Sequence, residues 1–180
     1  MGDMSKLITK DVFMELGKND KYFNESRWDH YSEVLSCIEQ IGITENVLEI
    51  GPYRAPFIQG SDIMDIKRHN YPFEINDFIK HDCSKVPFPI EDKKYDLVIA
   101  SQVLEHLGIR GEQVDVFNEI ERICDVAIVS LPYMWHVPKF RHHHMIDEKV
   151  FDVWASNRKY SLEEIHGENR LKRIMRVYEF

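Results

Sequence analysis

Apolar side chains recur along this chain in two spacings, which predict an alternation of helices and strands. Between Arg27 and Ile41 they fall three and four residues apart, so they share one face of a helix that ends at Gly42. The stretch between Gly111 and Cys124 has the same spacing and predicts a second helix. Short apolar, β-prone runs predict buried strands at 46–50, 61–66, 78–82, 95–100 and 126–131.

The last third of the chain adds one more helix, 147–156, and two terminal strands, 160–166 and 171–180. A further helix is expected to begin near Glu105–His106, directly after the fourth strand. Only about ten residues separate the first two strands, which leaves room for one or two helical turns at most. This alternation predicts a single α/β domain over residues 1–180, with a largely parallel sheet covered by helices on both faces.

The amino-acid composition argues against several classes of protein. Lys and Arg number 23 against 31 Asp and Glu, and the net charge of −8 argues against binding nucleic acid or anionic membranes by bulk charge. The widely spaced Cys37, Cys83 and Cys124 form no C-x-x-C pair, so we expect reduced thiols and no structural zinc site. The first residues lack a secretory pattern, and no stretch reaches ~18 uncharged apolar residues. We therefore expect a cytoplasmic protein that does not span a membrane.

Polar and acidic residues follow several of the predicted strands. In parallel sheets, ligands bind at the carboxyl ends of the strands, near the point where the strand order reverses. Carboxylates there suit a ligand with an amine, a ribose diol and an exocyclic amino group, because they accept hydrogen bonds from all three. They suit a phosphate-bearing cofactor poorly. The strand ends carry Glu49-Ile50-Gly51-Pro52, Asp62 or Asp65, Asp82-Cys83, Ser101-Gln102 and the run from Pro132 to His136.

The residues at these strand ends, within 47–131, resemble those of a known protein family. The string Val47-Leu48-Glu49-Ile50-Gly51-Pro52, the acidic end of the second strand, Asp82 and the string from Tyr95 to Leu107 resemble the class I, Rossmann-like S-adenosylmethionine-dependent methyltransferases. The resemblance implies a Rossmann-like methyltransferase fold with an antiparallel last strand, and S-adenosyl-L-methionine as cofactor. The implied activity is methyl transfer to an oxygen or nitrogen of a small-molecule acceptor.

The same resemblance divides the domain and assigns roles within it. It implies an N-terminal helical cap (1–45), a cofactor-binding core (46–131), and a substrate loop with terminal strands (132–180). The roles it implies in the core are Glu49 placing the methionine end by way of the following loop, Gly51 letting the backbone approach the cofactor, Asp65 (or Asp62) holding the ribose hydroxyls, Asp82 near the adenine amino group, Cys83 beside the ring, and Ser101 at the end of the fourth strand. Tyr53, which departs from the family pattern, is expected to cover the cofactor.

The loop after the first strand departs from the family pattern. Tyr53 and Ala55 stand where further glycines are common, and a Tyr adopts positive φ at a higher cost than a Gly. The alternative function is therefore a non-catalytic S-adenosylmethionine-binding or scaffolding module of the same fold. A nucleic-acid methyltransferase is disfavoured, because Ser101-Gln102-Val103 replaces the Asn/Asp-Pro-Pro-aromatic string of such enzymes.

His106 is the first candidate for acceptor chemistry. An unperturbed pKa near ~6.5 leaves an imidazole mostly neutral at physiological pH, so His106 is a candidate general base. The alternative is a histidine on a helix surface.

The loop after the fifth strand is expected to cover the acceptor site. Successive histidines at 142–144 point in different directions on an extended chain, so we expect no metal site there. The alternative for the whole loop is a solvated basic segment. Its candidate residues are Tyr133 and Trp135 as walls, Arg141 meeting an acidic or hydroxylated substrate, and His136 and His144 contributing to turnover.

Overall fold

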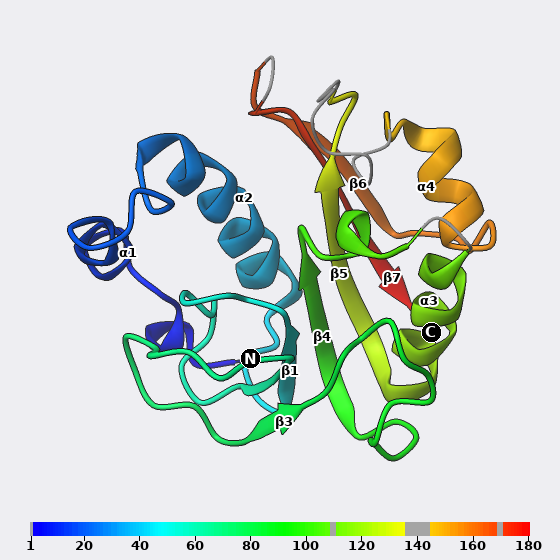
Figure 1. Ribbon diagram of the computed structural model, residues 1–180, viewed down its shortest axis with the longest axis horizontal. Coiled ribbons are helices and arrows are strands. Elements are labelled where there is room, and N and C mark those ends of the chain that lie inside the picture. Colours follow the sequence, from blue (N-terminus) through cyan, green and yellow to red (C-terminus); the bar gives the residue numbers. More distant parts are fainter. Residues whose placement is uncertain (1, 109–110, 136–144, 169–170) are drawn as a thin grey trace.

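The fold is built on one seven-stranded sheet. The computed structural model describes residues 2–108, 111–135, 145–168 and 171–180. The strands are β1 (Val47–Ile50), β2 (Asp62–Asp65), β3 (Phe78–Lys80), β4 (Tyr95–Ser101), β5 (Cys124–Pro132), β6 (Leu162–His166) and β7 (Arg173–Glu179). Their order across the sheet is β3-β2-β1-β4-β5-β7-β6 (Figure 1). All neighbouring pairs are parallel except those of β7 with β5 and β6, which confirms the α/β class and the antiparallel last strand.

Helices cover both faces of this sheet, as predicted. Figure 1 shows α1 (Lys10–Gly17) and α2 (Glu25–Ile41) on one side, and α3 (Glu112–Ile123) and α4 (Glu148–Trp154) on the other. The alternation of side chains along β4 gives the physical reason: Leu97 and Ile99 pack with the α1–α2 layer, whereas Val98 and Ala100 pack with the α3–α4 layer. No helix formed by the described residues is long and apolar enough to cross a bilayer.

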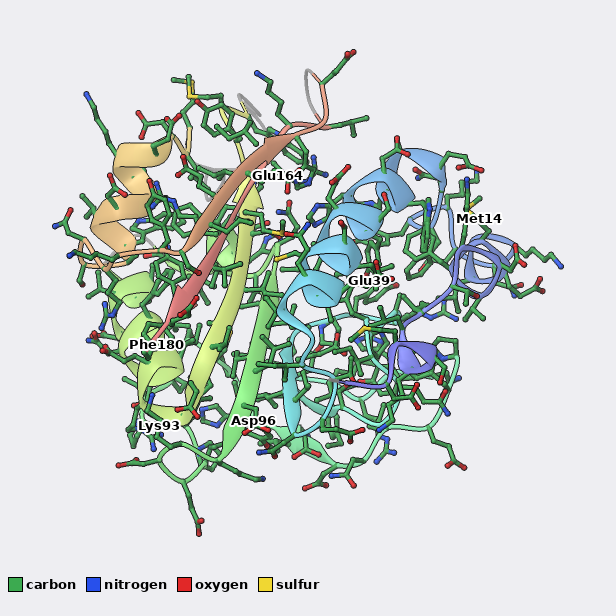
Figure 2. The ribbon with its side chains drawn as sticks, turned by 180° about the vertical axis from the view of Figure 1, so that it is seen from behind. Met14, Glu39, Lys93, Asp96, Glu164 and Phe180 are labelled. Carbon is green, nitrogen blue, oxygen red and sulfur yellow. The ribbon has the colours of Figure 1, made fainter. Side chains whose placement is uncertain are left out.

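The helix predicted over 27–41 is α2, and local capping sets both of its ends. The Asn24 side chain accepts a hydrogen bond from the backbone nitrogen of Arg27 at 3.2 Å, so the helix begins at Glu25, two residues before the apolar pattern does. Gly42 ends it at φ 75°, a left-handed conformation that glycine adopts at little cost. Figure 2 shows α2 lying along the sheet, where it buries Val34 and Ile38.

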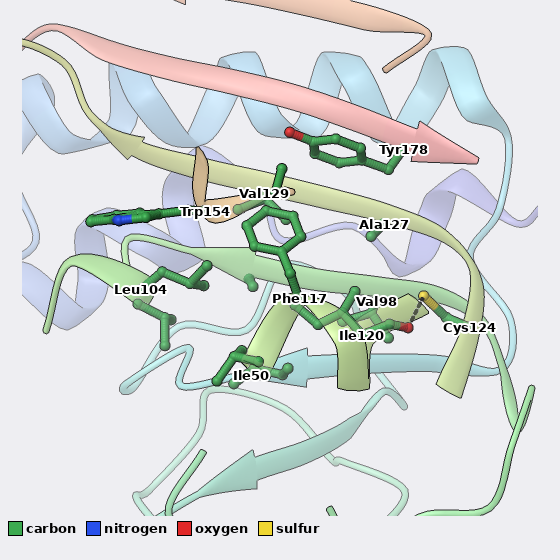
Figure 3. Packing of buried hydrophobic residues seen from close by; sticks show 14 of the residues in the cluster. Ile50, Val98, Leu104, Phe117, Ile120, Cys124, Ala127, Val129, Trp154 and Tyr178 are labelled. Atoms are coloured by element: carbon green, nitrogen blue, oxygen red, sulfur yellow. Dashed lines mark hydrogen bonds between the residues drawn. The ribbon is translucent and has the colours of Figure 1, made fainter. Parts of the chain in front are cut away.

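The opposite face of the sheet is packed by α3. Figure 3 shows Phe117 and Ile120 of this helix against Val98 of β4 and Ala127 of β5. Tyr178 of β7 completes the cluster, with its ring centroid 5.4 Å from that of Phe117. All five side chains are fully buried. Each large one contributes about 1.5–3 kcal/mol of transfer free energy, so this layer holds β4 and β5 rigidly in place.

The segments after β1, β2 and β3 contain no helix at all. Residues 51–61, 66–77 and 81–94 run as turns and loops, although the sequence left room for a short helix in the first of them. After β4 the structure also differs from the prediction, because a 3-10 turn, η2 (Leu104–His106), replaces the start of a longer helix. Leu107 ends that turn by adopting an extended conformation. Loops therefore follow the carboxyl ends of these strands, and their side-chain contacts shape the site.

Candidate functional site

A cavity of about 730 Å³, the main cavity, opens at the carboxyl ends of β1, β2 and β4. The strand order reverses between β1 and β4, so the cavity lies at the switch point where open α/β sheets bind ligands. The predicted site residues that line it are Gly51, Tyr53, Asp65, Asp82, Cys83 and His106.

Glu49 lies behind the main cavity and fixes the loop that follows β1. Its carboxyl group is 1% exposed and accepts hydrogen bonds from the backbone nitrogens of Phe57 at 2.7 Å and Ile58 at 2.9 Å. The hydroxyl of Ser61 lies 2.9 Å from the same carboxyl group. Burial raises the pKa of Glu49 to about 7, while these hydrogen bonds oppose the shift. Glu49 therefore holds the loop in place, and its predicted role at the methionine end of the cofactor stays a prediction.

Gly51 and Tyr53 form the part of that loop that faces the cavity. Gly51 has φ +60°, and a Cβ there would lie 3.2 Å from the side chain of Val103, so a larger residue meets both strain and crowding. Tyr53 also has positive φ, at 55°. Its hydroxyl donates to Asp20 at 2.9 Å and its ring stacks on Phe23, which compensates for the backbone strain and ties the N-terminal segment to the loop.

The two candidate ribose carboxylates lie at opposite ends of β2. Asp65 is at the carboxyl end and lines the main cavity, where it accepts a hydrogen bond from the backbone nitrogen of Lys67 at 3.3 Å. Asp62 is at the other end, is buried, and accepts hydrogen bonds from Asn76 at 2.6 Å and Tyr95 at 2.7 Å. Only Asp65 is placed to meet a ligand in the cavity.

Asp82 and Cys83 line the same cavity from the turn after β3. Asp82 accepts hydrogen bonds from the backbone and the hydroxyl of Ser84, at 3.0 and 2.7 Å, and these hold its pKa below the usual value. Burial raises the pKa of the Cys83 thiol to about 11, so the thiol is neutral at physiological pH. It offers a soft apolar surface and not a nucleophile.

Ser101 does not line the main cavity but a smaller one of about 40 Å³ beside it. The two cavities adjoin, because both are lined by Tyr22, Ile50, Gly51, Tyr53 and Gln102. The Ser101 hydroxyl lies 3.0 Å from Nε2 of His30 and 2.9 Å from the Ser130 hydroxyl. Its predicted contact with the cofactor stays a prediction.

His30 is a site residue that the sequence reasoning missed. It is 5% exposed on α2, and its Nδ1 lies 2.9 Å from Nε2 of His166 on β6. Burial lowers the pKa of His30 well below its ordinary value, and the neighbouring Arg173, His166 and Arg27 add to this shift. The sequence pattern could have predicted its burial, because His30 lies one turn before Val34 on the apolar face of the helix.

The remaining acceptor-site candidates are dispersed. The His106 side chain is 61% exposed at the rim of the main cavity, with its Nε2 3.9 Å from the buried Glu105 carboxylate. Tyr133 donates to Glu148 at 2.9 Å and Trp135 donates to the Lys172 carbonyl at 2.8 Å, and neither lines the two cavities described above. Their roles as walls stay predictions. The candidates His136, Arg141 and His144 lie outside the described residues.

Comparison with known proteins shows similarity to methyltransferases over part of the sequence and over the fold. Residues 59–126 match the family model described as a methyltransferase domain. No curated protein matches the chain. Among solved structures, the N-methyltransferase NodS of Bradyrhizobium japonicum in complex with S-adenosyl-L-homocysteine is 12% identical, with a TM-score of 0.64 over 93% of this chain and 97% of that one.

Two further solved structures share the fold. Magnesium protoporphyrin IX methyltransferase of Synechocystis with bound SAM is 11% identical, with a TM-score of 0.57 over 84% of this chain and 78% of that one. A SAM-dependent methyltransferase of Aquifex aeolicus is 12% identical, with a TM-score of 0.52 over 94% of this chain and 97% of that one. The sheet order and the site at its switch point define a Rossmann-like methyltransferase fold. The family model over residues 59–126 and these structures make the chain similar to S-adenosylmethionine-dependent methyltransferases.

Proposed function

We propose that this protein transfers a methyl group from S-adenosylmethionine to an oxygen or nitrogen atom of a small-molecule acceptor. The observation that carries the proposal is the lining of the main cavity. Gly51, Asp65, Asp82 and Cys83 come from three different strand ends, and the fold brings them around one space of about 730 Å³. Each has the chemistry that its predicted role requires.

The residues of the main cavity fit the cofactor group by group. The Asp65 carboxylate is an acceptor for the two ribose hydroxyls, and Asp82 with Cys83 offers an acceptor and an apolar contact for the adenine. The backbone at Gly51 carries no side chain and permits close approach of the methionine end. When bound, S-adenosylmethionine supplies an electrophilic methyl group on its sulfonium.

An acceptor O–H or N–H group loses its proton when it is methylated. His106 borders the main cavity with most of its side chain exposed, so its imidazole is accessible to an acceptor bound there. We therefore propose His106 as the residue that takes this proton. Positioning of the acceptor nucleophile supplies the rest of the rate enhancement, because the displacement itself requires an in-line approach.

The non-catalytic binding module remains the second candidate function. Its supporting observation is Tyr53, which replaces a common glycine, holds φ 55° and borders both cavities. A small-molecule acceptor is favoured over a nucleic acid by the net charge of −8. The fold is shared with enzymes named for different acceptors, so the acceptor itself follows from the local site and not from the fold.

Calorimetric titration with S-adenosylmethionine and S-adenosylhomocysteine, with NAD and ATP as controls, tests the donor site. We predict that Asp65→Ala weakens binding by about 1–3 kcal/mol, or about 5- to 150-fold, because the ribose hydroxyls lose their acceptor. The matched control is Asp96→Ala, since Asp96 is exposed at the amino end of β4, far from the cavity (Figure 2). Equal affinities of the two variants would remove Asp65 from the site, and binding without turnover of any acceptor would favour the non-catalytic module.

A further inference from the structure

Four polar side chains from four different elements form one hydrogen-bonded group, the histidine–serine network, beside the small cavity. It runs from His166 of β6 through His30 of α2 and Ser101 of β4 to Ser130 of β5. Nδ1 of His30 lies 2.9 Å from Nε2 of His166, and Nε2 of His30 lies 3.0 Å from the Ser101 hydroxyl. The two hydroxyls are 2.9 Å apart. His30 and Ser101 line the cavity, whereas His166 and Ser130 lie behind them.

Both imidazoles of the network are neutral at physiological pH. Burial lowers the pKa of His30 well below its ordinary value, and Arg173, His166 and Arg27 add to this shift. Burial also lowers the pKa of His166, although the charge of Glu33 opposes that change. A neutral imidazole has one nitrogen that donates a hydrogen bond and one that accepts. The single ring proton of His30 therefore faces either His166 or Ser101.

The histidine–serine network holds one proton more than its contacts can use. Each imidazole and each hydroxyl contributes one proton, whereas three contacts join the four groups. With its proton on Nδ1, His30 donates to His166 and accepts from Ser101, and the surplus proton lies on Nδ1 of His166. With its proton on Nε2, His30 donates to Ser101 and accepts from His166, and the surplus proton lies at the serine end.

The surroundings of His166 disfavour the surplus proton. Its Nδ1 is buried and has no hydrogen-bond partner in the part of the chain that the structure describes. The Glu33 carboxyl group, whose charge acts on His166, is hydrogen-bonded to Glu164 and not to this nitrogen. A proton on Nδ1 would therefore be a buried donor without an acceptor, which costs free energy.

The serine end offers the surplus proton a place beside a ligand. Ser130 is fully buried, and it accepts a hydrogen bond from the Gln102 amide at 3.5 Å and can donate its own proton to Ser101. The Ser101 oxygen has two lone pairs, so it accepts from both His30 and Ser130. The proton of Ser101 is then free to point into the small cavity that this residue lines.

We infer that His166 is a positioning residue of the donor site, which holds the proton of His30 on Nε2 and so makes Ser101 a hydrogen-bond donor toward S-adenosylmethionine. The inference rests on the proposed function, because it treats the small cavity beside Glu49 and Gly51 as part of the donor site. The oxygens at the methionine end of the cofactor accept such a hydrogen bond. His166 lines neither cavity, so it acts on the cofactor only through His30 and Ser101.

Nitrogen-15 NMR of the imidazoles tests the position of the protons on the full chain without ligand. Protonated and unprotonated ring nitrogens resonate far apart, so the spectrum distinguishes the two arrangements. The signals that disappear in His30→Gln and in His166→Gln assign the two rings. We expect the proton on Nε2 in both histidines, and a role of His166 in packing alone does not require this.

Calorimetric titration with S-adenosylhomocysteine tests whether the network acts on the cofactor. His166→Leu removes the donor that fixes the ring and the proton of His30, and it should weaken binding about 2- to 13-fold, as for one hydrogen bond. In a Ser101→Ala background the same substitution should change the affinity by less than about twofold, because its effect passes through Ser101. His166→Gln should restore most of the affinity, because its amide can still donate to Nδ1 of His30. His166 is only partly buried, so both variants are expected to fold.

The matched control is Ile165→Leu, which should bind as the wild type does. Ile165 is the exposed neighbour of His166 on β6, and its side chain points to the opposite face of the sheet. Three results each overturn the inference: a His30 proton on Nδ1, equal affinities of the His166→Leu and Ile165→Leu proteins, or the same loss with and without Ser101. Wild-type protein that does not bind S-adenosylhomocysteine refutes the donor site itself, whereas wild type that binds and gives one of these results refutes the inference alone.

Discussion

Glu49 permits the sharpest test of how the loop after β1 is held. Its two oxygens face three donors: the backbone nitrogens of Phe57 and Ile58 and the hydroxyl of Ser61. That hydroxyl also lies 2.9 Å from the Ile58 carbonyl, and its single proton can serve only one of these two acceptors. Burial raises the pKa of Glu49 to about 7, although the hydrogen bonds from Phe57, Ile58 and Ser61 oppose this rise.

We predict that Glu49→Gln lowers the free energy of unfolding by about 1–3 kcal/mol. The amide has nearly the shape of the protonated acid, and its oxygen still accepts from Phe57. Its NH₂ group, however, faces the backbone N–H of Ile58, so one buried donor loses its acceptor at the cost given above. For a domain of this size, each kcal/mol lowers the melting temperature by about 2–4 °C.

Urea unfolding followed by tryptophan fluorescence measures this change, and titration with S-adenosylhomocysteine reports whether the loop still forms the site. The matched control is Glu39→Gln, because Glu39 is exposed on α2 (Figure 2). If the two variants unfold at the same urea concentration with the same slope, Glu49 does not hold the loop and the reasoning is refuted.

Two further predictions concern groups around the cavities. Burial raises the pKa of Glu105 to about 8, so the protonated carboxyl stabilises the fold at low pH and this contribution is lost as the pH rises. Wild type should therefore lose stability relative to Glu105→Gln between about pH 5 and pH 8, by up to ~1.4 kcal/mol per pH unit in urea unfolding, and a constant difference would contradict this. His106→Ala should lower kcat by about 10²–10⁴-fold at saturating acceptor while leaving S-adenosylhomocysteine affinity unchanged, and equal losses of both would indicate a structural role.

Local patterns were sufficient to predict most of the architecture. The strands β1 to β5 were visible as short apolar runs, and α2 and α3 as periodic apolar faces, because backbone geometry ties side-chain direction to sequence spacing. The acidic residues at strand ends were predictable for the same reason, since parallel strands bring their carboxyl ends to one edge. Asp65 and Asp82 therefore line the cavity together.

The sequence left open which aspartate of β2 faces the cavity, because contacts between residues distant in sequence decide it. The choice between Asp62 and Asp65 depends on where β2 begins and ends, and pairing with its neighbours β1 and β3 fixes both. The turn at Leu104–His106 is a different case, because its end is local. It ends because Leu107 becomes extended, although the local sequence is compatible with a longer helix.

The sequence by itself determined the order of the elements, the class of the sheet and the chemistry at its carboxyl edge, because these follow from local periodicity and residue type. The tertiary structure alone decided the contact between His30 and His166. His30 and His166 are 136 residues apart, and they meet because α2 packs against the same sheet face that β6 and β7 extend. Burial then sets the charge states of His30 and Glu105, since desolvation depends on the surrounding packing and not on the residues themselves.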